Sequence, residues 1–349
     1  MGSKASLIII SLVLLCAALS YASTIFAPVA FALLLAALLW PVQRRLQSIL
    51  PRYVALLITL VLFALVFVLF GWTITWAFGR VARWVIADAA RFQQSYEDLR
   101  LWLENHGLAV GVLWTDNFGT SWILRTVQLV TARVNNTFSF WAIAVLYLVL
   151  GLIEIGDTEN RIRRMRNRTA RVVLLRGSRS TAKKLRDYML IRTLMSMLTG
   201  TLFWLFALFS GLPLAAEWGV LAFALNYIPF VGSFVATLLP TSLALVQFES
   251  WESVLLVFLG FNLIQFMVGS YIEPRVTGNA LSMSPVIVLF SVFFWGSLWG
   301  VFGAFIGVPI TIALLTFCRQ HPSSRWVFEL FGADNAKMRR AEIAGSAVP

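Results

Sequence analysis

The sequence has few of the residue types on which most enzymes and disulfide-rich domains depend. Its two cysteines, Cys16 and Cys318, both lie in apolar runs, so neither a disulfide framework nor a paired-cysteine metal site is available. The two histidines, His106 and His321, lie outside the apolar runs, and no GxSxG, HExxH or Walker A pattern occurs. We therefore predict that the chain is not an enzyme and that it needs no cofactor and no metal.

Charge is also scarce, and long apolar runs take its place. Charged residues make up 13% of the chain and hydrophobic residues 59%, and the mean hydropathy is +0.82. This composition indicates an all-α integral membrane protein whose main partner is the lipid bilayer. A helix needs about 20 apolar residues to cross the bilayer, which predicts about eight hydrophobic segments here. The runs that reach or approach this length are 7–40, which we expect to be two helices broken near Pro28, 53–79, 137–153, 193–210, 218–248, 253–272 and 286–318.

The basic residues gather in one place. Residues 157–192 hold twelve Lys or Arg against three acids, which is nine of the net +12 charges. A basic segment beside membrane helices is typical of a cytoplasmic loop, so we predict this role and no nucleic-acid partner. With that loop inside, the crossing pattern leaves both termini in the cytoplasm.

Residues 80–136 have a different charge balance. This region carries six bases and five acids, so it fits the side opposite the basic loop. Its first part repeats apolar residues at helical spacing, and Trp84, Trp102 and Trp114 favour the headgroup level, so we expect an interfacial or packing surface. The predicted regions are N-terminal transmembrane helices at 1–79, the interfacial region at 80–136, a helix at 137–156, the basic loop at 157–192, a transport core at 193–318 and a cytoplasmic tail at 319–349.

Two of the apolar runs are interrupted. Asn226, Pro229 and Gly232 divide 218–248, which predicts a re-entrant hairpin, with a single kinked helix as the alternative. Glycines at four-residue spacing divide 286–318, which suits either a second hairpin or close helix packing. A pair of broken membrane segments is the best sequence indication of a transport site near the bilayer midplane.

Polar residues between the two broken runs complete the predicted pathway. Asn262 and Gln265 share one helix face, where their amides contact a solute or bond a neighbouring helix. In the link "YIEPRVTGNALSMSP", Glu273 and Arg275 flank Pro274, which fits either a solvated turn or a gate at the end of a pathway. The predicted pathway residues are Asn226, Pro229, Gly232, Asn262, Gln265, Glu273, Arg275, Gly278, Asn279, Ser282 and Pro285.

Two motifs resemble those of the autoinducer-2 exporter family of bacterial membrane proteins. They are "LNYIPFVG" (225–232) and "IEPRVTGNALSMSPVIVLFSVFFWGSLWGVFGAFIGVPI" (272–310). One departure is Ser233, where the family often has a proline after the glycine. The resemblance implies a secondary transporter or exporter of a small solute in the bacterial inner membrane, and it favours the gate at Glu273 and Arg275. We also expect a homo-oligomer.

The solute stays open at this stage. The resemblance allows a quorum-sensing signal such as autoinducer-2, or sodium or lithium exchanged for protons. A proton-coupled exchanger needs a titratable carboxylate in the pathway, and Glu154, Glu217 and Glu273 are the candidates. An organic-solute exporter can use amides, hydroxyls and backbone groups instead. A membrane scaffold that transports nothing is the alternative from another class.

Overall fold

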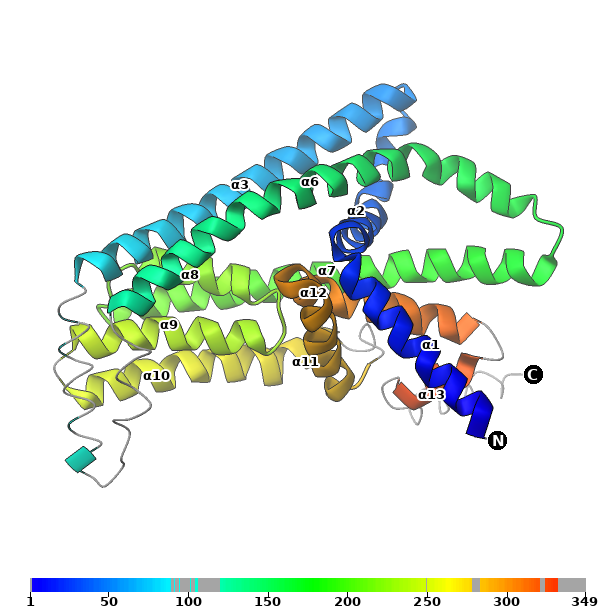
Figure 1. The fold of residues 1–349 in the computed structure, drawn as a ribbon. Helices are drawn as coiled ribbons and strands as arrows, with labels where there is room; N and C mark the ends of the chain where they lie inside the picture. The colour runs from blue at the N-terminus through cyan, green and yellow to red at the C-terminus, as the bar shows by residue number, and fades with distance from the viewer. Residues whose placement is uncertain are drawn as a thin grey trace, which may run out of the picture. The chain divides into compact units, whose positions relative to one another are not determined.

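The computed structural model describes residues 2–88, 120–248, 250–277, 283–320 and 324–331, together with Arg91, Gln94, Leu101, Glu104 and Asn105. Throughout these residues the regular structure is helical and contains no strand (Figure 1). The prediction of an all-α protein is confirmed.

Six helical stretches in the described part of the chain are long and apolar enough to cross a membrane. Their outward side chains are largely Leu, Val and Phe, which suits contact with lipid. The six are α2 (Ser23–Gln47), α3 (Arg52–Ala87), the Ser139–Arg163 part of α6 (Thr120–Arg163), α7 (Arg168–Phe209), the Trp251–Val276 run, and α12 (Pro285–Gln320). The Trp251–Val276 run joins α10 (Trp251–Phe266), the π-helix η1 (Met267–Ile272) and α11 (Glu273–Thr277).

Four further helices occur in the described residues. The end of the first of them, α1, corrects the break that was predicted near Pro28. Helix α1 ends at Tyr21 and α2 begins at Ser23, so the break falls at Ala22, and Pro28 lies inside α2. A proline removes one backbone donor, which an apolar helix tolerates in a membrane. The four are α1 (Gly2–Tyr21), α8 (Ala215–Leu225), α9 (Val231–Gln247) and α13 (Arg325–Phe331).

The predicted basic loop is helical along most of its length. Helix α6 continues to Arg163 and α7 begins at Arg168, which leaves only a short turn between them. Glu159 of α6 accepts from Arg163 on its own helix at 2.8 Å, and it joins α6 to α7 by accepting from Arg179 at 2.5 Å. Residues expected in a loop therefore extend two helices. The ends of the 80–136 region are also continuations of α3 and α6, while Trp102 and Trp114 lie outside the described residues.

The chain forms two compact units. The first contains residues 1–63, 140–191 and 276–349, and the second contains residues 64–139 and 192–275. The core of the second unit forms where α3, α7, α8, α9 and α10 bury small and aromatic side chains, among them Ala77, Phe203, Ala222, Ala244 and Phe261.

Helix α2 in the first unit contains Pro41, which cannot donate a backbone hydrogen bond, and a side chain of α7 supplies the missing donor. Pro41 has no N–H to donate to the carbonyl of Ala37, and the Arg186 guanidinium of α7 donates to that carbonyl at 3.2 Å. Two residues later, the fully buried Gln43 donates to the carbonyl of Leu152 at 3.4 Å. Arg186 thus satisfies a backbone carbonyl of α2, and Gln43 of α2 in turn bonds a backbone carbonyl of α6.

Helix α12 is a hairpin of two arms rather than one straight helix. Its backbone leaves the helical region at Gly300, with φ 65° and ψ −146°. A Cβ added at Gly307 would lie 2.8 Å from the carbonyl oxygen of Ser291, although sixteen residues of straight helix would separate them by about 24 Å. Trp295 also donates its ring N–H to the hydroxyl of Thr311 at 3.3 Å. The predicted division of 286–318 is confirmed, and its glycines pack one arm against the other.

Candidate functional site

The α8–α9 hairpin of the second unit is the first part of the candidate site. Helix α8 ends at Leu225, α9 begins at Val231, and residues 226–230 form the turn between them. Helix α8 has 11 residues, about 16 Å of helix, which is too short to cross a bilayer of about 30 Å. The predicted break is therefore confirmed, and the single kinked helix is excluded. Its re-entrant position in a membrane stays a prediction.

Glycine is required beside the turn because the two arms meet backbone to backbone. A Cβ added at Gly232 would overlap the carbonyl oxygen of Leu225. Phe230, which follows Pro229, has a positive φ of 63°, a conformation that costs about 1–3 kcal/mol for a residue with a side chain. The turn is a strained, closely packed structure, even though Ser233 stands where a second proline was expected.

A second close approach places α8 directly on α7. A Cβ on Gly200 would lie 2.7 Å from the carbonyl oxygen of Gly219, and a Cβ on Gly219 would lie 2.7 Å from the Cβ of Trp204. Gly200 and Gly219 therefore allow the backbones of α7 and α8 to touch. This contact brings the turn within reach of short polar side chains on α7.

Those side chains form a hydroxyl row on α7, made of Thr193, Ser196 and Thr199. A spacing of three residues keeps them on one side of the helix. Asn226 is 4% exposed, and its side-chain nitrogen donates to Ser196 at 3.3 Å and, more weakly, to Thr199 at 3.5 Å. The hydroxyl of Tyr227 donates to Thr193 at 2.9 Å. The hairpin turn thus meets α7 through a buried polar network.

An ion pair stands at one end of the hydroxyl row. Arg192 is one helical turn before Ser196, and its guanidinium lies 2.9 Å from the carboxylate of Glu273. The Arg192 side chain is 5% exposed and that of Glu273 is 22% exposed. The Nε of Arg192 has no hydrogen-bond partner among the described residues. Glu273 directly follows the π-helix η1, an irregularity that is frequent at functional sites.

Glu273 and Arg275, expected together as a solvated turn or a gate, do not pair with each other among the described residues. The guanidinium of Arg275 lies 3.7 Å from the ring centroid of Tyr271, on the exposed side of α11. Arg192 takes its place beside Glu273. Sequence reasoning missed Arg192 because it counted this residue as the last member of the basic cluster. The useful signal was that Arg192 shares helical spacing with Ser196 and Thr199.

A second ion pair lies at the base of the hairpin. Glu217 is in the first turn of α8, where a negative charge is favoured by the helix dipole, and its side chain is 4% exposed. The Nε of Arg80 on α3 lies 3.0 Å from its carboxylate, although the geometry is not that of a hydrogen bond. Glu154, the third candidate carboxylate, makes an exposed pair with Arg161.

The other predicted pathway residues are not part of this network. Asn262 donates to the carbonyl of Phe258 on its own helix at 2.8 Å, and it shows no bond to a neighbouring helix among the described residues. The side-chain nitrogen of Gln265 is buried without a partner among the described residues. Pro285 starts α12 in the first unit. Gly278, Asn279 and Ser282 lie outside the described residues. The described residues contain no group of three His, Cys, Asp or Glu capable of holding a metal.

Comparison with known proteins identifies a transport family. Residues 7–322 match the model of the family described as AI-2E family transporter. The chain is 27% identical over 313 residues to the AI-2 transport protein TqsA of Escherichia coli strain K12, covering 89% of this chain and 90% of TqsA. YhhT of the same strain, named as a candidate transport protein, is 30% identical over 167 residues, covering 48% of this chain and 47% of YhhT. YrrI of Bacillus subtilis strain 168, named likewise, is 25% identical over 312 residues, with 83% and 85% coverage. The relatives are named as transport proteins and not as enzymes. The predictions that this chain is a membrane transporter and that it is not an enzyme are therefore confirmed.

Proposed function

The chain belongs to the AI-2E family of transporters, and from this premise we propose that it exports a small polar organic solute past the tip of the α8–α9 hairpin. The family, its relatives and the long apolar helices make this chain a multi-pass membrane transporter. The finer proposal is supported by one observation, the buried network that joins Asn226 and Tyr227 to the hydroxyl row on α7.

The chemistry of this network suits a neutral solute that carries hydroxyl or carbonyl groups. Hydroxyls and amides both donate and accept hydrogen bonds, so they can exchange a partner on the protein for a partner on the solute. Broken helices near the middle of a membrane expose backbone groups that serve the same purpose. The name of TqsA refers to AI-2, so a quorum-sensing signal of that class is the first solute to test.

A sodium or lithium antiporter is the second candidate, and two buried carboxylates favour it. Glu217 is 4% exposed and Glu273 is 22% exposed. Each, however, is already neutralised by an arginine at 3.0 or 2.9 Å. A cation would have to displace Arg80 or Arg192 before it could bind, and separating the buried Arg192–Glu273 pair costs about 3–5 kcal/mol. We therefore rank the organic solute first. A scaffold that moves no solute does not fit the transport family.

A flux measurement tests the proposal and separates the two candidates. The purified chain is reconstituted in proteoliposomes loaded with AI-2, or with a sodium indicator, with and without imposed proton and sodium gradients. We expect protein-dependent movement of AI-2 and none of sodium. Sodium movement driven by a proton gradient, with no movement of AI-2, would instead establish the antiporter.

We also propose that both termini lie on the cytoplasmic side of the bacterial inner membrane and that the protein is a homo-oligomer. The basic ends of α6 and α7 support this orientation, because positive charge beside a crossing is retained in the cytoplasm. Reporter fusions after Thr181 and at the C-terminus test the orientation, and cross-linking in native membranes tests the assembly. Active periplasmic reporters would reverse the proposed topology.

A further inference from the structure

Helix α13 carries apolar side chains on two opposite sides. Phe328 is 4% exposed, whereas Trp326 is 62% exposed and Leu330 is 65% exposed. At 100° per residue, Trp326 and Leu330 lie about 40° apart on the helix surface, and each lies about 160° from Phe328. One side of α13 is therefore buried in protein, and the opposite side presents two large apolar side chains outward.

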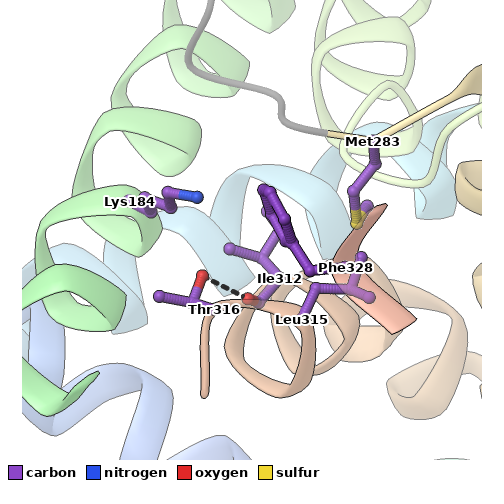
Figure 2. Close-up of a pocket in the computed structure, with 6 residues that line it drawn as sticks. All are labelled: Lys184, Met283, Ile312, Leu315, Thr316 and Phe328. Carbon is purple, nitrogen blue, oxygen red and sulfur yellow. Dashed lines mark hydrogen bonds between the residues drawn. The ribbon is translucent and has the colours of Figure 1, made fainter. Parts of the chain in front are cut away.

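The inner side of α13 is fixed by a closely filled cavity. Phe328 lies beside Ile312 and Leu315 of α12, Met283 of the preceding segment and Lys184 of α7, as Figure 2 shows. The space left between them is about 10 Å³, barely the room that one water molecule requires. The Lys184 ammonium lies 5.5 Å from the Phe328 ring centroid, and the Arg319 guanidinium lies 5.1 Å from it. These contacts fix the rotation of α13 about its own axis, so the outer side has one direction.

The position of α13 along the chain puts it at the edge of a membrane segment. The second arm of α12 is apolar until Arg319, and α12 ends at Gln320. The hydroxyl of Ser324, directly before α13, donates to the carbonyl of Cys318 at 3.0 Å. Helix α13 thus begins within one hydrogen bond of the end of α12. That is the level at which Trp is enriched and at which basic side chains meet lipid headgroups.

We propose that the outer side of α13, formed by Trp326 and Leu330, binds the surface of the lipid bilayer. Trp326 supplies an amphipathic ring and Leu330 an apolar side chain; of the nearby basic residues, Arg325 pairs with Glu329 at 3.1 Å and Arg319 packs on the Phe328 ring. Such a helix lies in the plane of the interface, with its apolar side about 5–10 Å inside the headgroup boundary. Through Phe328, this lipid contact holds the second arm of α12 at the membrane surface. The inference does not depend on which solute is transported.

Site-directed labelling of the full-length chain in proteoliposomes tests the proposal. Cys16→Ala and Cys318→Ala remove the native thiols, and Trp326→Cys, Leu330→Cys or Glu329→Cys then carries an environment-sensitive fluorophore. Glu329 is the matched control, because it lies on the same helix but on its flank, with its side chain 53% exposed. All three positions are exposed, so the variants should fold, which size-exclusion chromatography verifies.

We expect the labels at 326 and 330 to emit at shorter wavelength than the label at 329. Nitroxide lipids labelled near the headgroup should quench them, and aqueous iodide should quench the label at 329. Equal iodide quenching at all three positions would overturn the proposal, since the outer side would then face water. Protection of 326 and 330 from both quenchers would also overturn it, because the partner would then be protein, for example a second copy of this chain.

Discussion

The side-chain nitrogen of Asn226 lies 3.3 Å from the hydroxyl of Ser196, and both residues are buried. Asn226 directly follows α8, so this bond connects the turn of a broken hairpin to the middle of α7. An amide buried among apolar groups is costly unless it finds partners. The arrangement therefore couples the conformation of the turn to the hydroxyl row on α7.

Asn226→Ala should abolish most solute flux while the protein still folds. The hydroxyls of Ser196 and Thr199 can bond carbonyls of their own helix, so the stability loss should be about 1–3 kcal/mol. Flux from proteoliposomes and the Tm in detergent measure the two effects. Asn262→Ala is the matched control, because Asn262 bonds only the carbonyl of Phe258 in the described structure. Equal flux in the two variants would mean that Asn226 has no special role.

Arg192 and Glu273 should behave as a coupled pair. Arg192→Ala leaves the Glu273 carboxylate half-buried without its partner, and Glu273→Gln leaves a buried guanidinium, so each single change should destabilise the fold by about 3–5 kcal/mol. The double variant Arg192→Ala with Glu273→Gln removes both charges and should recover a large part of this loss. Thermal unfolding of the four proteins in one detergent gives the coupling free energy.

Arg275→Ala provides the comparison for this cycle. Arg275 is exposed and rests on the Tyr271 ring, so its removal should cost no more than about 1 kcal/mol. If Arg275→Ala proved as damaging as Arg192→Ala, or if the double variant were as unstable as the sum of the single variants, the assignment of Arg192 as the partner of Glu273 would be wrong.

Much of the fold could be predicted from the sequence, because apolar length and helix-breaking residues act locally. The seven apolar runs correspond to helices, and both interrupted runs form hairpins. The break near Pro28 was misplaced since a proline need not end a membrane helix. The extension of α6 and α7 through the basic segment was missed because the cluster of charges was interpreted as a loop, although Arg and Lys are also good helix formers.

The candidate site was predictable only in part. Asn226, Pro229 and Gly232 stand out because they interrupt an apolar run. Ser196 and Thr199, the partners of Asn226, do not stand out in the sequence. Serines and threonines are common in membrane helices, where they usually bond the backbone of their own helix. Arg192 was not singled out, because it was counted with the basic residues 157–192, which were interpreted as a cytoplasmic loop. The pairing of Glu273 with Arg192 depends on how their two helices pack, and the two residues lie 81 positions apart in the chain.

Gly232→Ala should prevent the α8–α9 hairpin from closing. The added methyl group would overlap the carbonyl of Leu225, which is backbone and cannot move aside as a flexible side chain could. We expect a lower yield of folded protein after detergent extraction, measured by fluorescence-detected size exclusion. Gly151→Ala is the control: no atom lies within 4 Å of an added Cβ at that helical position, and alanine favours helix by about 1 kcal/mol. Normal yield of both variants would contradict the backbone contact.

Gly300→Ala tests the reversal of the chain direction in α12. Here the expected destabilisation comes from the backbone conformation and not from a steric overlap. No atom lies within 4 Å of an added Cβ there, so crowding plays no part. The obstacle is the backbone, because φ 65° with ψ −146° is a conformation that residues with a side chain rarely adopt, at a cost of about 1–3 kcal/mol. Gly296→Ala on the same arm has a helical backbone, and its new methyl group would meet the Cβ of Ala304 at 3.5 Å, an ordinary contact. We therefore expect a lower Tm for Gly300→Ala and little change for Gly296→Ala. If α12 were a single straight helix, both substitutions would raise the Tm, since alanine is the better helix former.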